Sequence, residues 1–262
     1  MGVTDMPAFA WSGQFIKDVH DFEAYLRTMN APVWAKTAVV HHTYIPTLAQ
    51  WRSQATVDGM KRYYQYDVKN KDGSRGWDSG PHVFNAPNGI WIGTPPNQIG
   101  THAGIYNSTS WGIETVGNYD PVPFSPAIKA QLFGIIIALF KWRGITHVSL
   151  DTVRGHRECG SPKSCPGAAN NMNTLRGELA LALHKALEPN PGVTRWQIVR
   201  DPCPVRIARD IKASKALNNT AALPIGQIVD VDDITNGWLH LANSNPFRDL
   251  GFIQIQHAVK LS

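Results

Sequence analysis

The segment TAVVHHTY, residues 37–44, decides how this chain folds. It is rich in β-branched residues and predicts a buried strand. Two shorter strands are expected around residues 82–85 and 89–93, because the segment NAPNG between them has the Pro and the Asn-Gly pair of a tight hairpin turn. A further strand is expected over WGIETVG, residues 111–117, and HVSL at 147–150 is strand-like.

Helices are predicted before, between and after these strands. Residues 13–29 place apolar side chains at helical spacing. The clearest helix runs from Ser125, a suitable N-cap, to Gly144, a suitable end, and a last helix is expected over 172–187, where leucines recur in register. Strands that alternate with helices predict an α/β domain, with a central mixed β-sheet flanked by helices.

The composition of the chain changes after residue 188. The segment EPNPGVTR, residues 188–195, is typical of a linker, and the residues after it form short alternating patterns separated by turns, with no helical period. This tail predicts a small all-β barrel. We therefore expect two domains, residues 1–188 and 196–262, joined by a linker at 189–195.

Composition and charge exclude several classes of protein. The chain has 262 residues, of which 43% are hydrophobic and 17% charged, as in ordinary globular proteins. Its net charge of +5 is not concentrated in a Lys/Arg run, so we expect no nucleic-acid partner. The first residues lack a basic stretch followed by an apolar run, and the longest apolar run, FGIIIALF at 133–140, is too short to cross a bilayer. We expect synthesis in the cytoplasm without a signal peptide, and no membrane span.

The number and spacing of the cysteines indicate which roles they can have. Cys159, Cys165 and Cys203 are an odd number in a chain without an export signal, which does not favour a disulfide framework. Cys159 and Cys165 lie six residues apart, a poor fit to a thioredoxin-like redox pair. Metal binding and ordinary structural cysteines are the two interpretations left.

Histidines near these cysteines favour a metal site without requiring one. His41 and His42 are adjacent on a strand, so their side chains point to opposite faces and only one can face a given site. His156 and Cys165 share a loop that is long enough to fold back on itself. One strand histidine with His156 and Cys165 would make a zinc site with an open fourth position. Packed, hydrogen-bonded side chains fit the same pattern.

Four segments, taken together, resemble the zinc-dependent N-acetylmuramoyl-L-alanine amidases of the type-2 amidase and peptidoglycan-recognition-protein superfamily. In chain order they are VVHHT (39–43), THAG (101–104), WGIETVGNYD (111–120) and GHRECGSPKSCPG (155–167). The resemblance implies a central mixed sheet and hydrolysis of the amide between the lactyl group of N-acetylmuramic acid and L-alanine. It also implies one zinc ion per chain, held by His41, His156 and Cys165, with His42 pointing into the core.

The same resemblance implies the other site residues. Glu114, in the segment GIE, corresponds to the catalytic base of some members. Other members use a Tyr where this chain has Pro81, which has no proton to transfer. Lys163 corresponds to a lysine that stabilises the oxyanion, and His102 and Asn107 to substrate contacts. Without the resemblance, Glu114 would be interpreted as a salt-bridged strand residue and Lys163 as a solvated surface residue.

The tail, residues 196–262, is similar to bacterial SH3-type modules that accompany cell-wall hydrolases. A catalytic domain with such a module and no signal peptide indicates a phage or prophage endolysin. We expect a monomer that leaves the cell through a holin-type pore and acts on peptidoglycan and muropeptides. Two alternatives stay open: a cytoplasmic amidase that recycles anhydro-muropeptides, and a non-catalytic peptidoglycan-binding receptor. The recycling enzymes usually lack a tail module, and the receptors typically lack the cysteine ligand.

Overall fold

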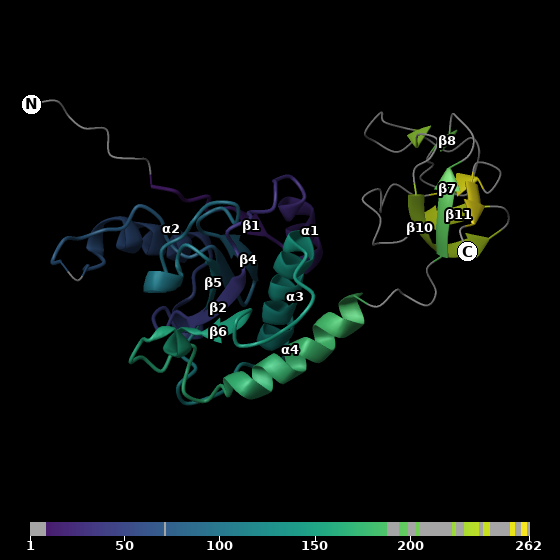
Figure 1. Ribbon diagram of the computed structural model, residues 1–262. Coiled ribbons are helices and arrows are strands. Elements are labelled where there is room, and N and C mark those ends of the chain that lie inside the picture. Colours follow the sequence, from purple (N-terminus) through teal and green to yellow (C-terminus); the bar gives the residue numbers. More distant parts are fainter. Residues whose placement is uncertain are drawn as a thin grey trace, which may run out of the picture. The chain divides into compact units, whose positions relative to one another are not determined.

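The chain divides into two compact units, residues 1–187 and 188–262, which are described separately (Figure 1). The computed structural model describes residues 9–70 and 72–187. In the second unit it describes the strand segments 194–198, 203–204, 222–223, 228–235, 238–241, 252–254 and 258–260. Within these residues, no helix combines the length and the apolar character that a membrane crossing requires.

The first unit is built on a six-stranded sheet in the order β1-β4-β3-β5-β2-β6. The strands are β1 (Phe15–Ile16), β2 (Thr37–His42), β3 (Val83–Ala86), β4 (Gly89–Ile92), β5 (Ser110–Thr115) and β6 (Val153–Gly155). The four strands β3, β5, β2 and β6 run parallel, whereas β4 and β1 are antiparallel to their neighbours. The predicted central mixed sheet is confirmed.

Helices cover both faces of this sheet (Figure 1). They are α1 (Val19–Leu26), α2 (Gln54–Arg62), α3 (Pro126–Arg143) and α4 (Met172–Leu187), with short helical turns η1 (Leu48–Gln50), η2 (Tyr63–Asp67, a π-helical turn), η3 (Gly104–Tyr106) and η4 (His156–Cys159). The helix α3 begins and ends as predicted, because the Ser125 hydroxyl accepts the Ile128 N–H and Gly144 adopts a φ of 78°.

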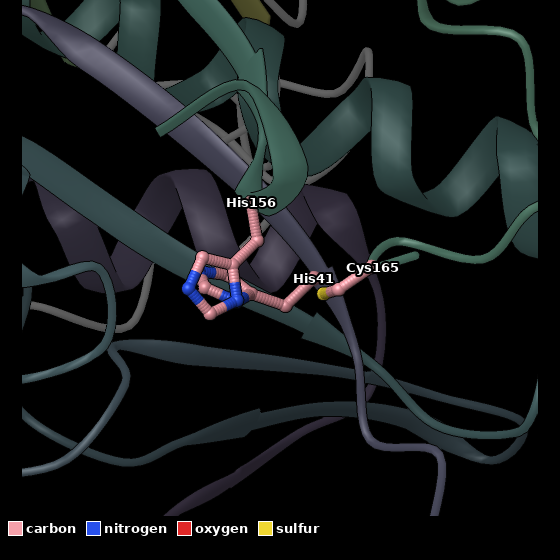
Figure 2. Close-up of side chains that lie close together, drawn as sticks. All are labelled: His41, His156 and Cys165. Carbon is pink, nitrogen blue, oxygen red and sulfur yellow. The ribbon is translucent and has the colours of Figure 1, made fainter. Parts of the chain in front are cut away.

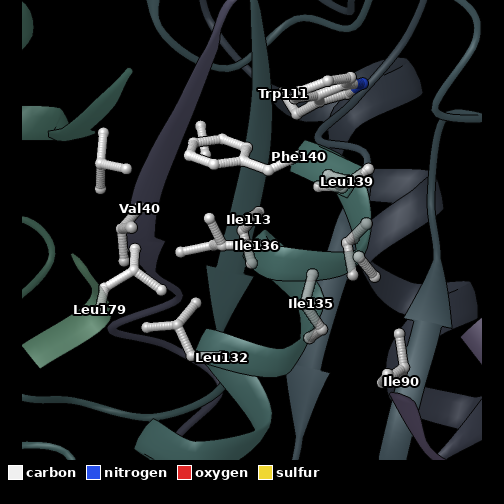
Figure 3. Close-up of a cluster of buried hydrophobic side chains, with 14 of the residues drawn as sticks. Val40, Ile90, Trp111, Ile113, Leu132, Ile135, Ile136, Leu139, Phe140 and Leu179 are labelled. Carbon is white, nitrogen blue, oxygen red and sulfur yellow. The ribbon is translucent and has the colours of Figure 1, made fainter. Parts of the chain in front are cut away.

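The larger core lies between the sheet and the helices α1, α3 and α4 (Figure 3). Trp111, Ile113 and Val40 of the sheet pack there with Ile135 and Leu139 of α3, and all five side chains are buried. A second cluster, which includes Phe84 of β3 and Val57 of α2, covers the opposite face. Since successive strand residues alternate between faces, the residues that follow Val40 and Ile113 project toward the α2 side.

Two elements differ from the sequence-based prediction. The helix expected over 13–29 is shorter, because Phe15 and Ile16 instead pair with Trp91 and Ile90 of β4. The helix α1 begins only after Asp18, whose carboxylate caps it by accepting the Asp21 N–H at 3.0 Å. The strand-like segment HVSL at 147–150 precedes a turn, and the strand in this region is β6.

The second unit contains a five-stranded antiparallel sheet in the order β12-β11-β10-β7-β13. Its strands are β7 (Thr194–Ile198), β10 (Ile228–Thr235), β11 (Trp238–Leu241), β12 (Phe252–Gln254) and β13 (Ala258–Lys260), and a separate pair is formed by β8 (Cys203–Pro204) and β9 (Ala222–Leu223). Residues 189–193 of the predicted linker lie outside the described residues, whereas 194–195 belong to β7.

Candidate functional site

The parallel strands β2, β5 and β6 end at the same edge of the sheet, where ligands of α/β proteins commonly bind. His41 is the penultimate residue of β2, and it pairs in register with Glu114 of β5. His156 follows directly after β6. The topology therefore brings together residues that lie far apart in the sequence, and His41 and Glu114 share the α2 face of the sheet.

Three side chains at this edge form a compact set of metal donors. The ligand atoms of His41, His156 and Cys165 all lie within 4.8 Å of one another. Figure 2 shows the three side chains converging from β2, from the start of η4 and from the loop that follows it. The structure thus places together the three residues for which the sequence predicts a shared site.

The protonation states of the donors fit a metal ion. Burial, and then the neighbouring His102, hold the pKa of His41 well below its usual 6.5. Burial, with a smaller effect of Lys163, lowers the pKa of His156 to about 4. Both imidazoles are therefore neutral at neutral pH and can offer a lone pair.

Cys165 completes a donor set that suits zinc. Burial and the nearby Glu114 raise the pKa of the Cys165 thiol, a direction that a coordinated cation reverses, because a thiol bound to zinc is deprotonated. The Cys165 sulfur also accepts the backbone N–H of His42 at 3.4 Å, a contact that favours a thiolate. Two neutral imidazoles and one thiolate are a donor set that zinc prefers, with a fourth position left for solvent or substrate.

Partly buried hydrogen bonds fix the loop that carries His156 and Cys165. The Arg157 backbone N–H donates to the Cys165 carbonyl at 2.8 Å, and its guanidinium donates to the carbonyls of Ser164 and Gly167, both at 2.9 Å. Glu158 accepts two hydrogen bonds from the Arg176 guanidinium, at 2.8 and 3.0 Å. The sequence analysis did not assign these roles to Arg157 and Glu158. Cys159 ends η4 and does not line the cavity at the donor set, and its thiol donates to the Gly155 carbonyl.

Glu114 is a buried carboxyl group next to the donor set. Its Oε1 lies 3.8 Å from His41 Nδ1, and because that imidazole is neutral, the contact is not an ion pair. Burial raises the pKa of Glu114 to about 8, and Lys163 partly offsets this rise. The carboxyl group is therefore mostly protonated at pH 7 and about half-ionised at pH 8, so it can exchange a proton close to neutral pH.

Glu114 and the three metal donors line one cavity of about 840 Å³. Lys163 is exposed, yet its positive charge lowers the pKa of four groups in the cavity: His41, His156, Glu114 and Cys165. The same cavity is also lined by four aromatic side chains: Tyr44, Tyr63, Tyr64 and Trp77. Sequence reasoning missed Tyr64 and Trp77, whose rings stack at 5.3 Å and come from η2 and the loop after it. Burial and then the nearby Glu114 raise the pKa of Tyr64 well above 10.

The remaining predicted residues lie around His41. His42 faces the core side, where its Nδ1 accepts the Tyr119 N–H at 3.1 Å. His102 is buried and lines the cavity, with its Nδ1 at 3.1 Å from His41 Nε2. Asn107 does not line this cavity, and instead its Oδ1 accepts the backbone N–H groups of His102 and Ala103 at 2.9 and 2.6 Å.

The chain is similar to peptidoglycan-recognition proteins and to N-acetylmuramoyl-L-alanine amidases. It is 29% identical over 181 residues to peptidoglycan-recognition protein SC2 of Drosophila simulans, which covers 67% of this chain and 86% of that protein. Two solved structures are more distant. The endolysine N-acetylmuramoyl-L-alanine amidase LysCS from Clostridium intestinale URNW is 19% identical with a TM-score of 0.40, over 64% of this chain and 90% of that chain. Drosophila PGRP-LB wild-type is 24% identical with a TM-score of 0.42, over 60% and 84%.

A family model covers the part of the chain that builds the site. The model for Amidase_2, described as N-acetylmuramoyl-L-alanine amidase, matches residues 30–168, more than half of the 262 residues. This range contains His41, Glu114, His156 and Cys165. The chain therefore belongs to the Amidase_2 family of N-acetylmuramoyl-L-alanine amidases.

Proposed function

We propose that this protein is a zinc-dependent amidase that hydrolyses the bond between the lactyl group of N-acetylmuramic acid and L-alanine. The observation that carries the proposal is the donor set itself: His41, His156 and Cys165 place their ligand atoms within 4.8 Å of one another, beside a buried Glu114. Family membership supports the reaction class, and the complete set of donors favours catalysis over binding alone.

The three donors would hold the metal, and the neighbouring side chains would move the proton. A zinc ion there supplies polarisation of the scissile carbonyl and acidification of the attacking water, and its charge favours ionised Glu114. Glu114 then accepts the proton of the attacking water and passes it to the amine of L-alanine as the bond breaks. Burial raises the pKa of Glu114 to about 8, and a cation beside it would lower this value toward neutral pH, where a carboxyl group is suited to both transfers.

Lys163 contributes positive charge at the mouth of the cavity. Its ammonium stabilises the oxyanion that develops on the scissile carbonyl, a role worth several kcal/mol in comparable sites, roughly 3–4. The role is supported by the effect of the Lys163 charge, which lowers the pKa values of Glu114, His41 and His156. A direct substrate contact by His102 or Asn107 stays a prediction.

We further infer that the substrate is the polymeric cell wall and that the protein acts as an endolysin. The second unit supports this proposal through its antiparallel five-stranded sheet, which is compatible with the SH3-type modules that its sequence resembles. Binding of the wall by this unit would raise the local concentration of glycan-linked peptide around the catalytic unit. Action on the wall requires the protein to leave the cytoplasm, as through a holin-type pore.

End-group analysis of digested sacculi tests the proposal. The zinc-loaded protein is expected to release new L-alanine amino termini and no new reducing sugar ends. Cys165→Ser should abolish the release together with zinc binding. Cys159→Ser, the same substitution elsewhere in the loop, should preserve both. Binding to sacculi without new amino termini would indicate a receptor, and cleavage of soluble muropeptides alone would indicate a recycling amidase.

A further inference from the structure

We propose that His102 is a positioning residue that fixes the tautomer of His41, so that His41 offers the lone pair of Nδ1 to a metal ion. The inference rests on the proposed metal site and adds a residue that acts through one of its ligands. It is carried by a chain of hydrogen bonds that runs from Ser110 through His102 to His41, in which the position of each hydrogen follows from the partner before it.

The first link is between His102 and Ser110. The Nε2 atom of His102 lies 3.2 Å from the Ser110 backbone carbonyl, which can only accept a hydrogen bond. The Ser110 hydroxyl, 3.4 Å from the same nitrogen, donates its own hydrogen to the Tyr106 carbonyl at 2.6 Å, so it too is left as an acceptor for this contact. The hydrogen of His102 therefore resides on Nε2.

The second hydrogen bond, between His102 and His41, then determines the tautomer of His41. The His102 side chain is buried, which disfavours a charged imidazolium, and a neutral ring carries a single hydrogen. Since that hydrogen is on Nε2, the Nδ1 atom of His102 is an acceptor. The contact of 3.1 Å between His102 Nδ1 and His41 Nε2 then requires His41 to donate. The lone pair of His41 is consequently on Nδ1, the atom that lies 3.8 Å from Glu114 in the cavity.

The ring of His102 is held against the sheet by its surroundings. A Cβ atom at Gly112 of β5 would lie 2.4 Å from Cγ of His102, so the ring can occupy this position only because residue 112 is glycine. Asn107 fixes the backbone on the other side by accepting the His102 and Ala103 N–H groups. Both ring nitrogens of His102 are engaged within the protein, which distinguishes this role from direct hydrogen bonding to substrate.

Partners that orient a metal-ligating histidine typically contribute about 10- to 100-fold in metal affinity. Two substitutions that each reproduce the position of one ring nitrogen separate orientation from packing. In His102→Asn the side-chain oxygen can take the place of Nδ1, so an acceptor for His41 is retained. In His102→Gln the amide reaches the place of Nε2, so the contact with Ser110 is retained and the acceptor for His41 is lost.

Zinc affinity by chelator competition and histidine nitrogen NMR spectra of the metal-free protein, both on the full chain, test the proposal. We expect the Nε2–H tautomer of His41 in the parent chain. We also expect a zinc dissociation constant about 10- to 100-fold higher in His102→Gln, and a value within about threefold of the parent in His102→Asn. An Nδ1–H tautomer in the parent chain, unchanged affinity in His102→Gln, or equal losses in both variants would overturn the proposal.

These readouts do not depend on turnover. If zinc binds with the expected tautomer and walls are not cleaved, the proposed amidase function fails while the role of His102 stands. The spectrum of the parent chain also decides the question if a variant fails to fold.

Discussion

Replacement of Glu114 by Gln tests the claim that a buried, proton-exchanging carboxyl group lies beside the metal donors. Gln keeps the shape and burial of Glu and cannot ionise. In the metal-free protein, burial raises the pKa of Glu114 from an ordinary 4.5 to about 8. The native state therefore retains a proton that the unfolded chain releases between these two pH values, so Glu114 makes the free energy of unfolding fall as pH rises through this window.

The size of this effect follows from the pKa change. At about 1.4 kcal/mol per pKa unit, the parent chain loses about 4–5 kcal/mol between pH 4.5 and pH 8 through this group alone. The Gln side chain does not titrate, so the free energy of unfolding of Glu114→Gln does not fall for this reason. We expect the two proteins to be about equally stable near pH 4, and the variant to be more stable by about 4–5 kcal/mol at pH 8.

Denaturant unfolding of both proteins in the presence of a chelator, at several values between pH 4.5 and 8, measures the difference. Other titrating groups are common to both chains and cancel. Glu178→Gln, the same substitution on the helix α4 in a partly exposed ion pair with Lys129, should change stability by less than about 1 kcal/mol across the range. A flat difference between the parent and Glu114→Gln would refute the reasoning, because Glu114 would then be ionised in the native state.

The same variant tests catalysis, and three further changes probe the rest of the site. Zinc-loaded Glu114→Gln should show a kcat lower by about 10²- to 10⁴-fold with its zinc retained, and a parental kcat would exclude Glu114 as the base. Lys163→Ala should lower kcat on a soluble muramoyl peptide by about 10²- to 10³-fold at unchanged zinc content, and unchanged kcat would make Lys163 a surface residue. Removal of residues 196–262 should weaken sacculus binding and preserve turnover of the soluble peptide, whereas equal losses on both substrates would show that the tail supports the catalytic unit. Gly112→Ala should displace the His102 ring and weaken zinc binding by about tenfold or more, whereas Gly177→Ala, where an added Cβ meets nothing within 4 Å, should not.

The sequence predicts those parts of the fold that local chemistry determines. The helix α3 carries its own boundaries in Ser125 and Gly144, and β2 is apparent from its β-branched residues. Phe15 and Ile16 fit a helical pattern equally well, and only their pairing with β4, more than 70 residues away, makes them a strand. The pairing of short edge strands depends on such distant partners, which a local pattern does not contain.

The candidate site, too, is only partly predictable from the sequence. His41, His156 and Cys165 are recognisable because metal donors are few in kind and their motifs are distinctive. The aromatic lining formed by Tyr64 and Trp77 has no comparable signal, since tyrosines near a helix are common in cores and on surfaces alike. The contact between His41 and His102 joins residues 61 positions apart in the sequence, and its meaning depends on which nitrogen faces which partner.

Titration of zinc into metal-free protein, with hydrolysis of a soluble muramoyl-L-alanyl peptide as the readout, tests directly whether this protein is a zinc-dependent amidase. We expect no turnover without metal, a linear rise in rate, and a plateau at one zinc ion per chain. In Cys165→Ser no rise is expected, whereas Cys159→Ser should follow the parent curve. Full turnover by the metal-free protein, or stoichiometric zinc binding without any hydrolysis, would contradict the proposed function.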